Sequence, residues 1–299
     1  MEEDLKKYLD PKVLAKISKL DLKARLIVEG FISGLHKSPF HGFSVEFAQH
    51  REYVPGDDTR HIDWKVFAKS DRYYIKQYEQ ETNLKGYILL DVSESMGYTS
   101  GGMTKLEYGG CIAASLTYLM LQQQDAVGLA LFDDQVREFI RDSGHPSHLK
   151  LLVHKIEQAT PTGKTKVRGI FDDLAERIHR RGLVIIISDL FVDPDDLLVS
   201  LRHFRHKRHE VIIFHVLDEF ERTFPFTELT LFKGLEQYPQ VFAEPRSLRR
   251  DYLNEFEGFV RKVKQGCRQH GIDYVQVSTS DNLEVALSSY LAARMARTK

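Results

Sequence analysis

The chain has 299 residues, of which 42% are apolar and 28% charged, a composition typical of an ordinary globular protein. Its formal net charge is −1, so no overall field draws it to nucleic acid or to anionic lipid. The N-terminus lacks the apolar stretch of a signal peptide, and no apolar run approaches the roughly 20 residues that cross a bilayer. We therefore expect a cytoplasmic protein with no integral membrane segment, and peripheral association with a membrane complex stays open.

The chain changes character near Asn83. Before it, a helical start over residues 22–30 leads into glycine-punctuated, aromatic-rich segments. After it, apolar runs of strand length alternate with segments of helical periodicity. We expect strands at residues 86–91, 126–132, 136–141, 183–189, 210–217 and 273–277, and helices at residues 105–124, 149–159, 167–181, 194–209, 246–270 and 282–294.

Strands separated by helices of ten or more residues predict parallel pairing through right-handed crossovers. The expected fold is therefore α/β: a doubly wound, mostly parallel sheet flanked by helices. We place this domain at residues 84–299, with an N-terminal extension at residues 1–83. The two cysteines, Cys111 and Cys267, have no metal-ligand or redox spacing and are expected to be small buried thiols.

The first strand of the domain ends in a polar motif. Asp91 closes the apolar run, and Ser93 and Ser95 follow in the pattern D-x-S-x-S. Alternate residues of an extended segment project to the same side, so these three side chains can converge on one point. A carboxylate and two hydroxyls are hard oxygen ligands, which suit Mg²⁺ or Mn²⁺ and suit Zn²⁺ poorly.

Two further segments extend this motif. The strand at residues 183–189 ends in Asp189, and a loop before a later helix offers Thr165. Because ligands of doubly wound sheets bind beyond the carboxyl ends of the strands, we expect both side chains at the same edge as the first motif. Thr160 and Thr162 lie in the same loop, so the identity of the contributing threonine stays open.

This arrangement resembles the metal-ion-dependent adhesion site of von Willebrand factor A domains. The resemblance implies that the metal set is Asp91, Ser93, Ser95, Thr165 and Asp189. It also implies that one coordination position of Mg²⁺ or Mn²⁺ stays open for an acidic side chain of a protein partner. The expected function is then metal-dependent protein binding and not catalysis.

A second resemblance covers nearly the whole chain. Residues 51–64 (REYVPGDDTRHIDW) look like the signature of the bacterial family called domain of unknown function fifty-eight. That family implies association with a MoxR-type AAA+ ATPase, for which this chain would be an adaptor or co-chaperone. Within the signature, residues 55–58 (PGDD) have turn chemistry, which favours a structural role, and Trp64 leaves a partner-binding role open.

Two other hypotheses compete with the metal-dependent adaptor. A metal-dependent phosphoester hydrolase would use the same carboxylates with a second metal about 4 Å away. Asp133 and Asp134, at the end of a neighbouring strand, are the candidates for that second site. A scaffold that binds no metal is the third hypothesis, against which the complete D-x-S-x-S motif argues.

Overall fold

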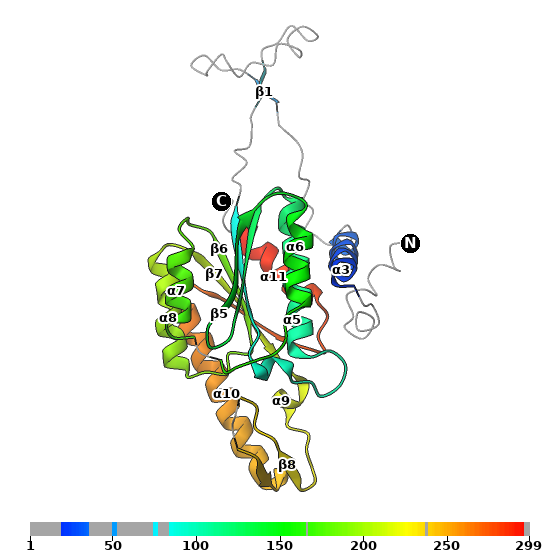
Figure 1. Ribbon diagram of the computed structural model, residues 1–299, viewed down its shortest axis with the longest axis vertical. Coiled ribbons are helices and arrows are strands. Elements are labelled where there is room, and N and C mark those ends of the chain that lie inside the picture. The colour runs from blue at the N-terminus through cyan, green and yellow to red at the C-terminus, as the bar shows by residue number, and fades with distance from the viewer. Residues whose placement is uncertain are drawn as a thin grey trace. The chain divides into compact units, whose positions relative to one another are not determined.

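The computed structural model describes residues 19–35, 50–52, 74–76, 84–165, 167–236 and 239–295. The chain divides into two compact units, of which one comprises residues 1–37 and 84–299 and the other residues 38–83. Figure 1 shows the larger unit as a twisted sheet between two layers of helices. In the described part of the chain, no helix is long and apolar enough to cross a membrane.

The central sheet has six strands in the order β10-β7-β6-β3-β4-β5. All neighbours pair in parallel except β5, which runs antiparallel to β4 at the edge of the sheet. The strands are β3 (Lys85–Asp91), β4 (Ala126–Phe132), β5 (Val136–Ser143), β6 (Leu183–Ser188), β7 (Glu210–Leu217) and β10 (Asp273–Ser278). The predicted α/β fold with a mostly parallel sheet is confirmed.

Helices cover both faces of this sheet. One layer contains α3 (Leu20–Leu35), α5 (Lys105–Gln122), α6 (His148–Glu157) and α11 (Glu284–Met295). The other contains α7 (Ile170–Arg177), α8 (Pro194–His206) and α10 (Pro245–Gln269). Each predicted helix of the domain is present, and α7 is shorter at both ends than the periodicity suggested.

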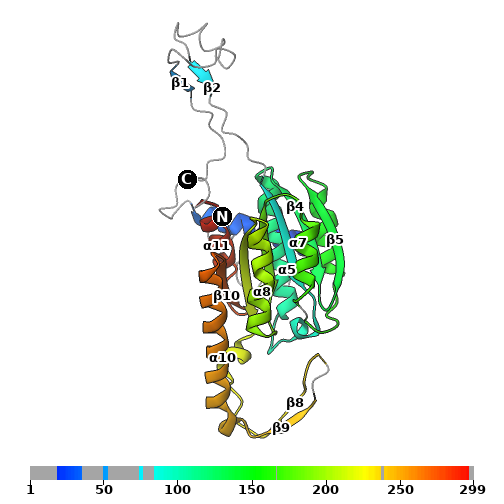
Figure 2. The same ribbon diagram turned by 90° about the vertical axis from the view of Figure 1, so that its left-hand side faces the viewer.

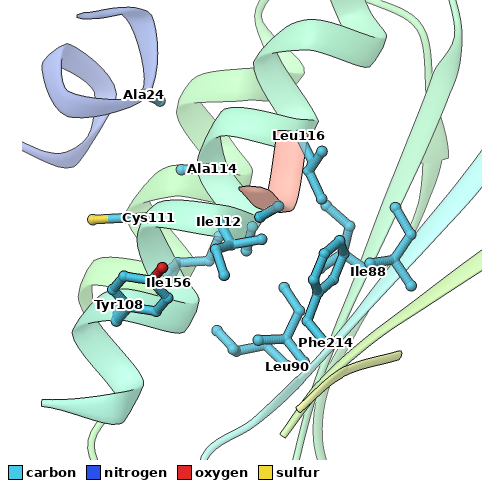
Figure 3. Packing of buried hydrophobic residues seen from close by; sticks show 14 of the residues in the cluster. Ala24, Ile88, Leu90, Tyr108, Cys111, Ile112, Ala114, Leu116, Ile156 and Phe214 are labelled. Atoms are coloured by element: carbon cyan, nitrogen blue, oxygen red, sulfur yellow. The ribbon is translucent and has the colours of Figure 1, made fainter. Parts of the chain in front are cut away.

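The strands are buried on both faces because each face supports its own hydrophobic core. In β3, Ile88 and Leu90 point into the core under α5, while Tyr87 and Leu89 belong to the core under α7 and α8. This alternation is the period of two that a strand imposes on its side chains. Figure 3 shows the first core, where Ile88, Leu90 and Phe214 of the sheet face residues of α5 such as Ile112 and Leu116. Cys111 and Cys267 are buried free thiols, one in each core.

The first described helix belongs to the larger unit. Ala24, Ile27 and Val28 of α3 are buried in the same core as α5 and α6. The backbone N–H of Leu20 donates to Glu157 Oε1 at 2.9 Å, which ties the start of α3 to the end of α6. Part of the segment that we assigned to an N-terminal extension therefore completes one helical layer of the domain.

The smaller unit contributes a short antiparallel pair, β1 (His50–Glu52) and β2 (Tyr74–Lys76). In this pairing Arg51 lies opposite Ile75. The signature at residues 51–64 falls mostly in residues 53–73, outside the described part of the chain. Its turn at residues 55–58 and Trp64 therefore stay predictions.

Three elements between β7 and α10 were not predicted from the sequence. A short helix, α9 (Glu219–Thr223), follows β7, and the antiparallel strands β8 (Thr230–Phe232) and β9 (Val241–Ala243) form a hairpin before α10. Figure 2 shows this hairpin next to the N-terminal end of α10, beyond one end of the sheet. Strands of three residues are too short to produce a period in the sequence.

Candidate metal site

The predicted site residues lie beyond the carboxyl end of the sheet. Asp91 is the last residue of β3, and Ser93 and Ser95 follow in a turn that includes the 3-10 helix η3 (Glu94–Gly97). Asp189 directly follows β6, which is the parallel neighbour of β3. Ile187 of β6 pairs with Leu90 of β3. The parallel register therefore brings the two aspartates to the same edge. All five predicted residues are buried: Asp91, Ser93, Ser95, Thr165 and Asp189.

Hydrogen bonds fix the orientation of the Asp91 carboxylate. The backbone N–H of Ser93 donates to Asp91 Oδ1 at 2.9 Å, and the Ser188 hydroxyl donates to Asp91 Oδ2 at 2.6 Å. The hydroxyl oxygens of Ser93 and Ser95 lie 3.1 Å apart. The two serine side chains therefore converge, as expected, but the turn into the 3-10 helix brings them together and not the alternation of an extended segment.

Burial and charge act together on Asp91. The side chain is 0% exposed, and burial together with the nearby charge of Asp189 raises the pKa of Asp91 to about 7. Hydrogen bonds from Ser188 and Ser93 lower it and offset only part of that effect. The negative charges of the two carboxylates repel one another, and a cation between them would relieve the repulsion.

Asp189 has a different environment because a lysine neutralises it. Lys105 Nζ lies 2.7 Å from Asp189 Oδ2 and 2.7 Å from Glu221 Oε1, and the lysine side chain is only 2% exposed. Burial alone would raise the pKa of Asp189, but the charge and hydrogen bond of Lys105, with a further hydrogen bond from Ser95, hold it below its usual value. Burial would likewise lower the pKa of Lys105, and the two carboxylates raise it instead. The ammonium therefore stays charged.

The backbone of Asp189 is also fixed. His215 Nε2 lies 2.9 Å from the carbonyl oxygen of Asp189, which as an acceptor requires the proton on Nε2. Burial lowers the pKa of this fully buried histidine to about 4, so the ring is neutral at physiological pH. His215 is thus a positioning residue for the Asp189 backbone.

Glu236 links Thr165 to the D-x-S-x-S turn by hydrogen bonds. The Thr165 hydroxyl donates to Glu236 Oε1 at 2.8 Å, and Glu236 lies in the segment between β8 and β9. The backbone N–H of Glu236 donates in turn to Glu94 Oε2 at 2.9 Å, between the two serines of the motif. Of the three threonines in the loop, Thr165 is buried while Thr160 and Thr162 are exposed.

Backbone hydrogen bonds hold the threonine loop against the D-x-S-x-S turn. The N–H of Thr162 donates to the carbonyl oxygen of Val92 at 2.8 Å, and the N–H of Glu94 donates to that of Gly163 at 3.0 Å. Gly163 has a φ of 70°, a left-handed conformation that glycine adopts without the steric cost of a side chain. These two contacts place the loop that carries Thr165 beside Ser93 and Ser95.

The residues present fit a hard divalent cation. They offer carboxylate and hydroxyl oxygens, which Mg²⁺ and Mn²⁺ prefer. The raised pKa of Asp91 indicates that the positive charge around its carboxylate does not compensate the negative charge. Within the described ranges, no group of three or more His, Cys, Asp or Glu side chains is arranged to hold a metal ion. The candidate site is thus a pair of aspartates supplemented by hydroxyls.

Asp133 and Asp134, the candidates for a second metal, have an arginine partner. Arg137 Nε lies 2.6 Å from Asp133 Oδ2, and Arg137 Nη2 lies 3.1 Å from Asp134 Oδ1. The Thr162 hydroxyl also donates to Asp133 Oδ2 at 3.3 Å. Asp133 therefore uses its carboxylate to fix the start of β5 and the threonine loop.

Three charged residues of the site were not predicted from the sequence. Lys105 could have been found, because it begins the helix that follows the motif and therefore starts at the same edge of the sheet. Glu221 and Glu236 gave no such signal, because α9 and the β8–β9 hairpin have no sequence periodicity. Only the tertiary fold brings them to the site.

Comparison with known proteins identifies relatives and structural neighbours. A family model described as Protein of unknown function DUF58 matches residues 49–258. Uncharacterized protein Rv1480 of Mycobacterium tuberculosis and Uncharacterized protein Mb1516 of Mycobacterium bovis are each 24% identical over 290 residues, which is 95% of this chain and 90% of the relative.

Similar solved structures include domains of the von Willebrand factor A type. Conserved hypothetical protein BatB from Bacteroides thetaiotaomicron has 16% identity and a TM-score of 0.49, covering 72% of this chain and 99% of that chain. The SpRpn10 VWA domain has 15% identity and a TM-score of 0.39, covering 68% of this chain and 93% of that chain. At such low similarity, nothing about activity follows from these likenesses.

Proposed function

This chain belongs to the family described as Protein of unknown function DUF58, and from that premise we propose that it is a metal-dependent protein-interaction module. The resemblance noted in residues 51–64 is thereby confirmed at the level of the family. The proposed site binds Mg²⁺ or Mn²⁺ at Asp91 and Asp189. The bound cation then receives an acidic side chain of a protein partner.

The observation that carries this proposal is that the positive charge around Asp91 does not compensate the negative charge of its buried carboxylate. Asp91 and Asp189 are both buried, and Lys105 neutralises Asp189 while Asp91 has a pKa raised to about 7. A buried carboxylate with a raised pKa is a common feature of functional sites, because the fold keeps the unfavourable group for a ligand. A divalent cation is the ligand that such a group fits.

Each residue has a role in holding the cation. Asp91 and Asp189 would supply negative charge, and Ser93, Ser95 and Thr165 would supply hydroxyl oxygens. The cation itself would supply a coordination position that a carboxylate can enter, since Mg²⁺ in proteins retains exchangeable water. Lys105 can keep its contact with Glu221 if its contact with Asp189 is weakened.

The partner class that we propose is a MoxR-type AAA+ ATPase, on the basis of the family resemblance. The chain would act as its adaptor or co-chaperone, and it would offer the metal to an acidic residue of the ATPase or of its client. Mixing the purified chain with such an ATPase in Mg²⁺ and in EDTA tests this point. Binding that is equal in the two conditions would contradict a metal-mediated contact.

Calorimetric titration of Mg²⁺ and Mn²⁺ into the metal-free protein tests the site directly. We expect one-site binding by the wild type, loss of binding in Asp91→Ala, and retention in Asp134→Ala. Asp134 is a suitable control because it is an exposed aspartate that also follows a strand of the sheet. Absence of binding by the wild type would leave the metal-free scaffold as the better function.

The hydrolase alternative predicts a different stoichiometry. It requires a second cation close to the first, and its candidate ligand Asp133 is paired with Arg137. Two cations bound per chain, together with turnover of a phosphoester such as p-nitrophenyl phosphate, would favour the hydrolase. One cation and no turnover would favour the interaction module.

A further inference from the structure

The segment between β8 and β9 places a glutamate carboxylate, that of Glu236, at the proposed site. Glu236 is 3% exposed, although it lies in a connection between two three-residue strands. Glutamate is rarely so buried unless a specific partner holds it. Here that partner is Thr165, whose hydroxyl donates to Glu236 Oε1 at 2.8 Å.

The backbone of Glu236 is held toward the site as well. Its N–H donates to Glu94 Oε2 at 2.9 Å, and Glu94 is the residue between Ser93 and Ser95. Glu236 has a φ of 55°, a left-handed conformation that is uncommon for a residue with a side chain. Both contacts of Glu236 thus involve the two loops that carry the proposed hydroxyl ligands.

Aromatic packing anchors the base of the hairpin. The ring centroids of Phe224 and Tyr252 lie 4.6 Å apart, and those of Phe226 and Phe232 lie 5.2 Å apart. These contacts join the segment after α9 to β8 and to α10. The hairpin itself leaves apolar side chains exposed, with Phe242 65% and Val241 53% exposed. The base of the hairpin is therefore firmly packed, whereas its strands contribute little to the core.

We propose that Glu236 is an internal ligand of the metal site, and that it occupies the position which the acidic side chain of a partner would take. This inference rests on the proposed function, because it assigns a residue to the same metal. A glutamate carboxylate is the same chemical group that the partner would offer. In the isolated chain the site is then closed by its own hairpin, and a partner binds only by displacing Glu236.

The competition has a clear physical basis. Glu236 is tethered to the site, so its effective concentration there is high, and a free carboxylate at low concentration competes poorly with it. Withdrawal of Glu236 breaks the hydrogen bonds to Thr165 and Glu94 and releases the left-handed backbone of residue 236. A partner that holds the exposed strands of the hairpin would make that withdrawal easier.

Water-proton relaxation by bound Mn²⁺ tests the inference without an identified partner. The variants are Glu236→Ala and the shape-preserving Glu236→Gln, with Glu228→Ala as the control because Glu228 is an exposed glutamate in the connection between α9 and β8. Acetate serves as the carboxylate probe. Each variant is first checked for a wild-type circular dichroism spectrum.

We expect both Glu236 variants to bind Mn²⁺ several-fold more weakly than the wild type, and to show higher relaxation per bound ion because water replaces the carboxylate. Acetate should then reduce that relaxation in the Glu236 variants, and leave the wild type and Glu228→Ala unchanged. Mn²⁺ binding with equal affinity, relaxation and acetate response in all four proteins would overturn the role of Glu236 and leave the metal site intact. Failure of the wild type to bind Mn²⁺ would instead overturn the proposed function.

Discussion

Replacement of Asp91 by asparagine should make the metal-free protein more stable at alkaline pH. Asparagine has nearly the same size, and its carbonyl oxygen can accept the hydrogen bond that the Ser93 N–H gives to Asp91 Oδ1. It has no charge to bury and no repulsion from Asp189. The substitution therefore separates the cost of the charge from the packing of the side chain.

The size of the effect follows from the pKa of Asp91. Burial and the charge of Asp189 raise that pKa from 3.8 to about 7. At about 1.4 kcal/mol for each unit of pKa shift, this corresponds to about 4 kcal/mol in the free energy of unfolding. Because the folded-state pKa is the higher one, this contribution to stability is fully present below pH 3.8 and is lost as the pH rises through about 7. Roughly 3 kcal/mol of the difference between variant and wild type should appear between about pH 5 and about pH 8.5.

Thermal unfolding in EDTA measures this difference. For a domain of this size, about 1 kcal/mol shifts Tm by roughly 2–4 °C, so the gap should widen by roughly 6–12 °C between the two pH values. Addition of Mg²⁺ at the higher pH should raise the Tm of the wild type and leave that of Asp91→Asn unchanged. A gap that does not depend on pH, or an equal response of both proteins to Mg²⁺, would refute the reasoning.

Three further substitutions test the surroundings of the site. Lys105→Met should destabilise the metal-free protein by about 3–5 kcal/mol in urea unfolding, because it leaves Asp189 buried without its ion-pair partner. Addition of Mg²⁺ should then increase the stability of this variant more than that of the wild type. A variant as stable as the wild type in EDTA would contradict this reasoning. Gly128→Ala should cost about 1–3 kcal/mol with Mg²⁺ affinity unchanged, because a Cβ would lie 2.6 Å from ring atoms of Tyr87 and 2.9 Å from the backbone oxygen of Ile140. A neutral effect on urea unfolding would contradict this steric argument. For His215 the folded-state pKa of about 4 lies below the unfolded value of 6.5, so its contribution of about 3 kcal/mol is present above pH 6.5 and is lost as the pH falls toward 4. The pH profile of urea unfolding for His215→Gln should lack that loss, and a profile parallel to that of the wild type would disprove the assignment.

The sequence determined the order of the elements and the position of the main motif. The strands β3, β4, β6 and β7 can be recognised in the sequence because a strand buried on both faces has nearly continuous hydrophobic residues. Once these runs alternate with helices, parallel pairing brings their ends to one edge. Asp91 and Asp189 could therefore be placed together from the sequence alone, since each directly ends such a run.

The tertiary structure decided what surrounds those two aspartates. Lys105 at the start of α5 pairs with Asp189 after β6 and with Glu221 of α9 only because the fold brings these three elements together. The burial of Glu236 depends on a hairpin with no periodic pattern. The assignment of α3 to the domain core depends likewise on contacts with α5 and α6, which are distant in sequence. Local sequence specifies local conformation and the pattern of burial, whereas the charge balance of a buried site is a sum over residues that only the folded chain brings together.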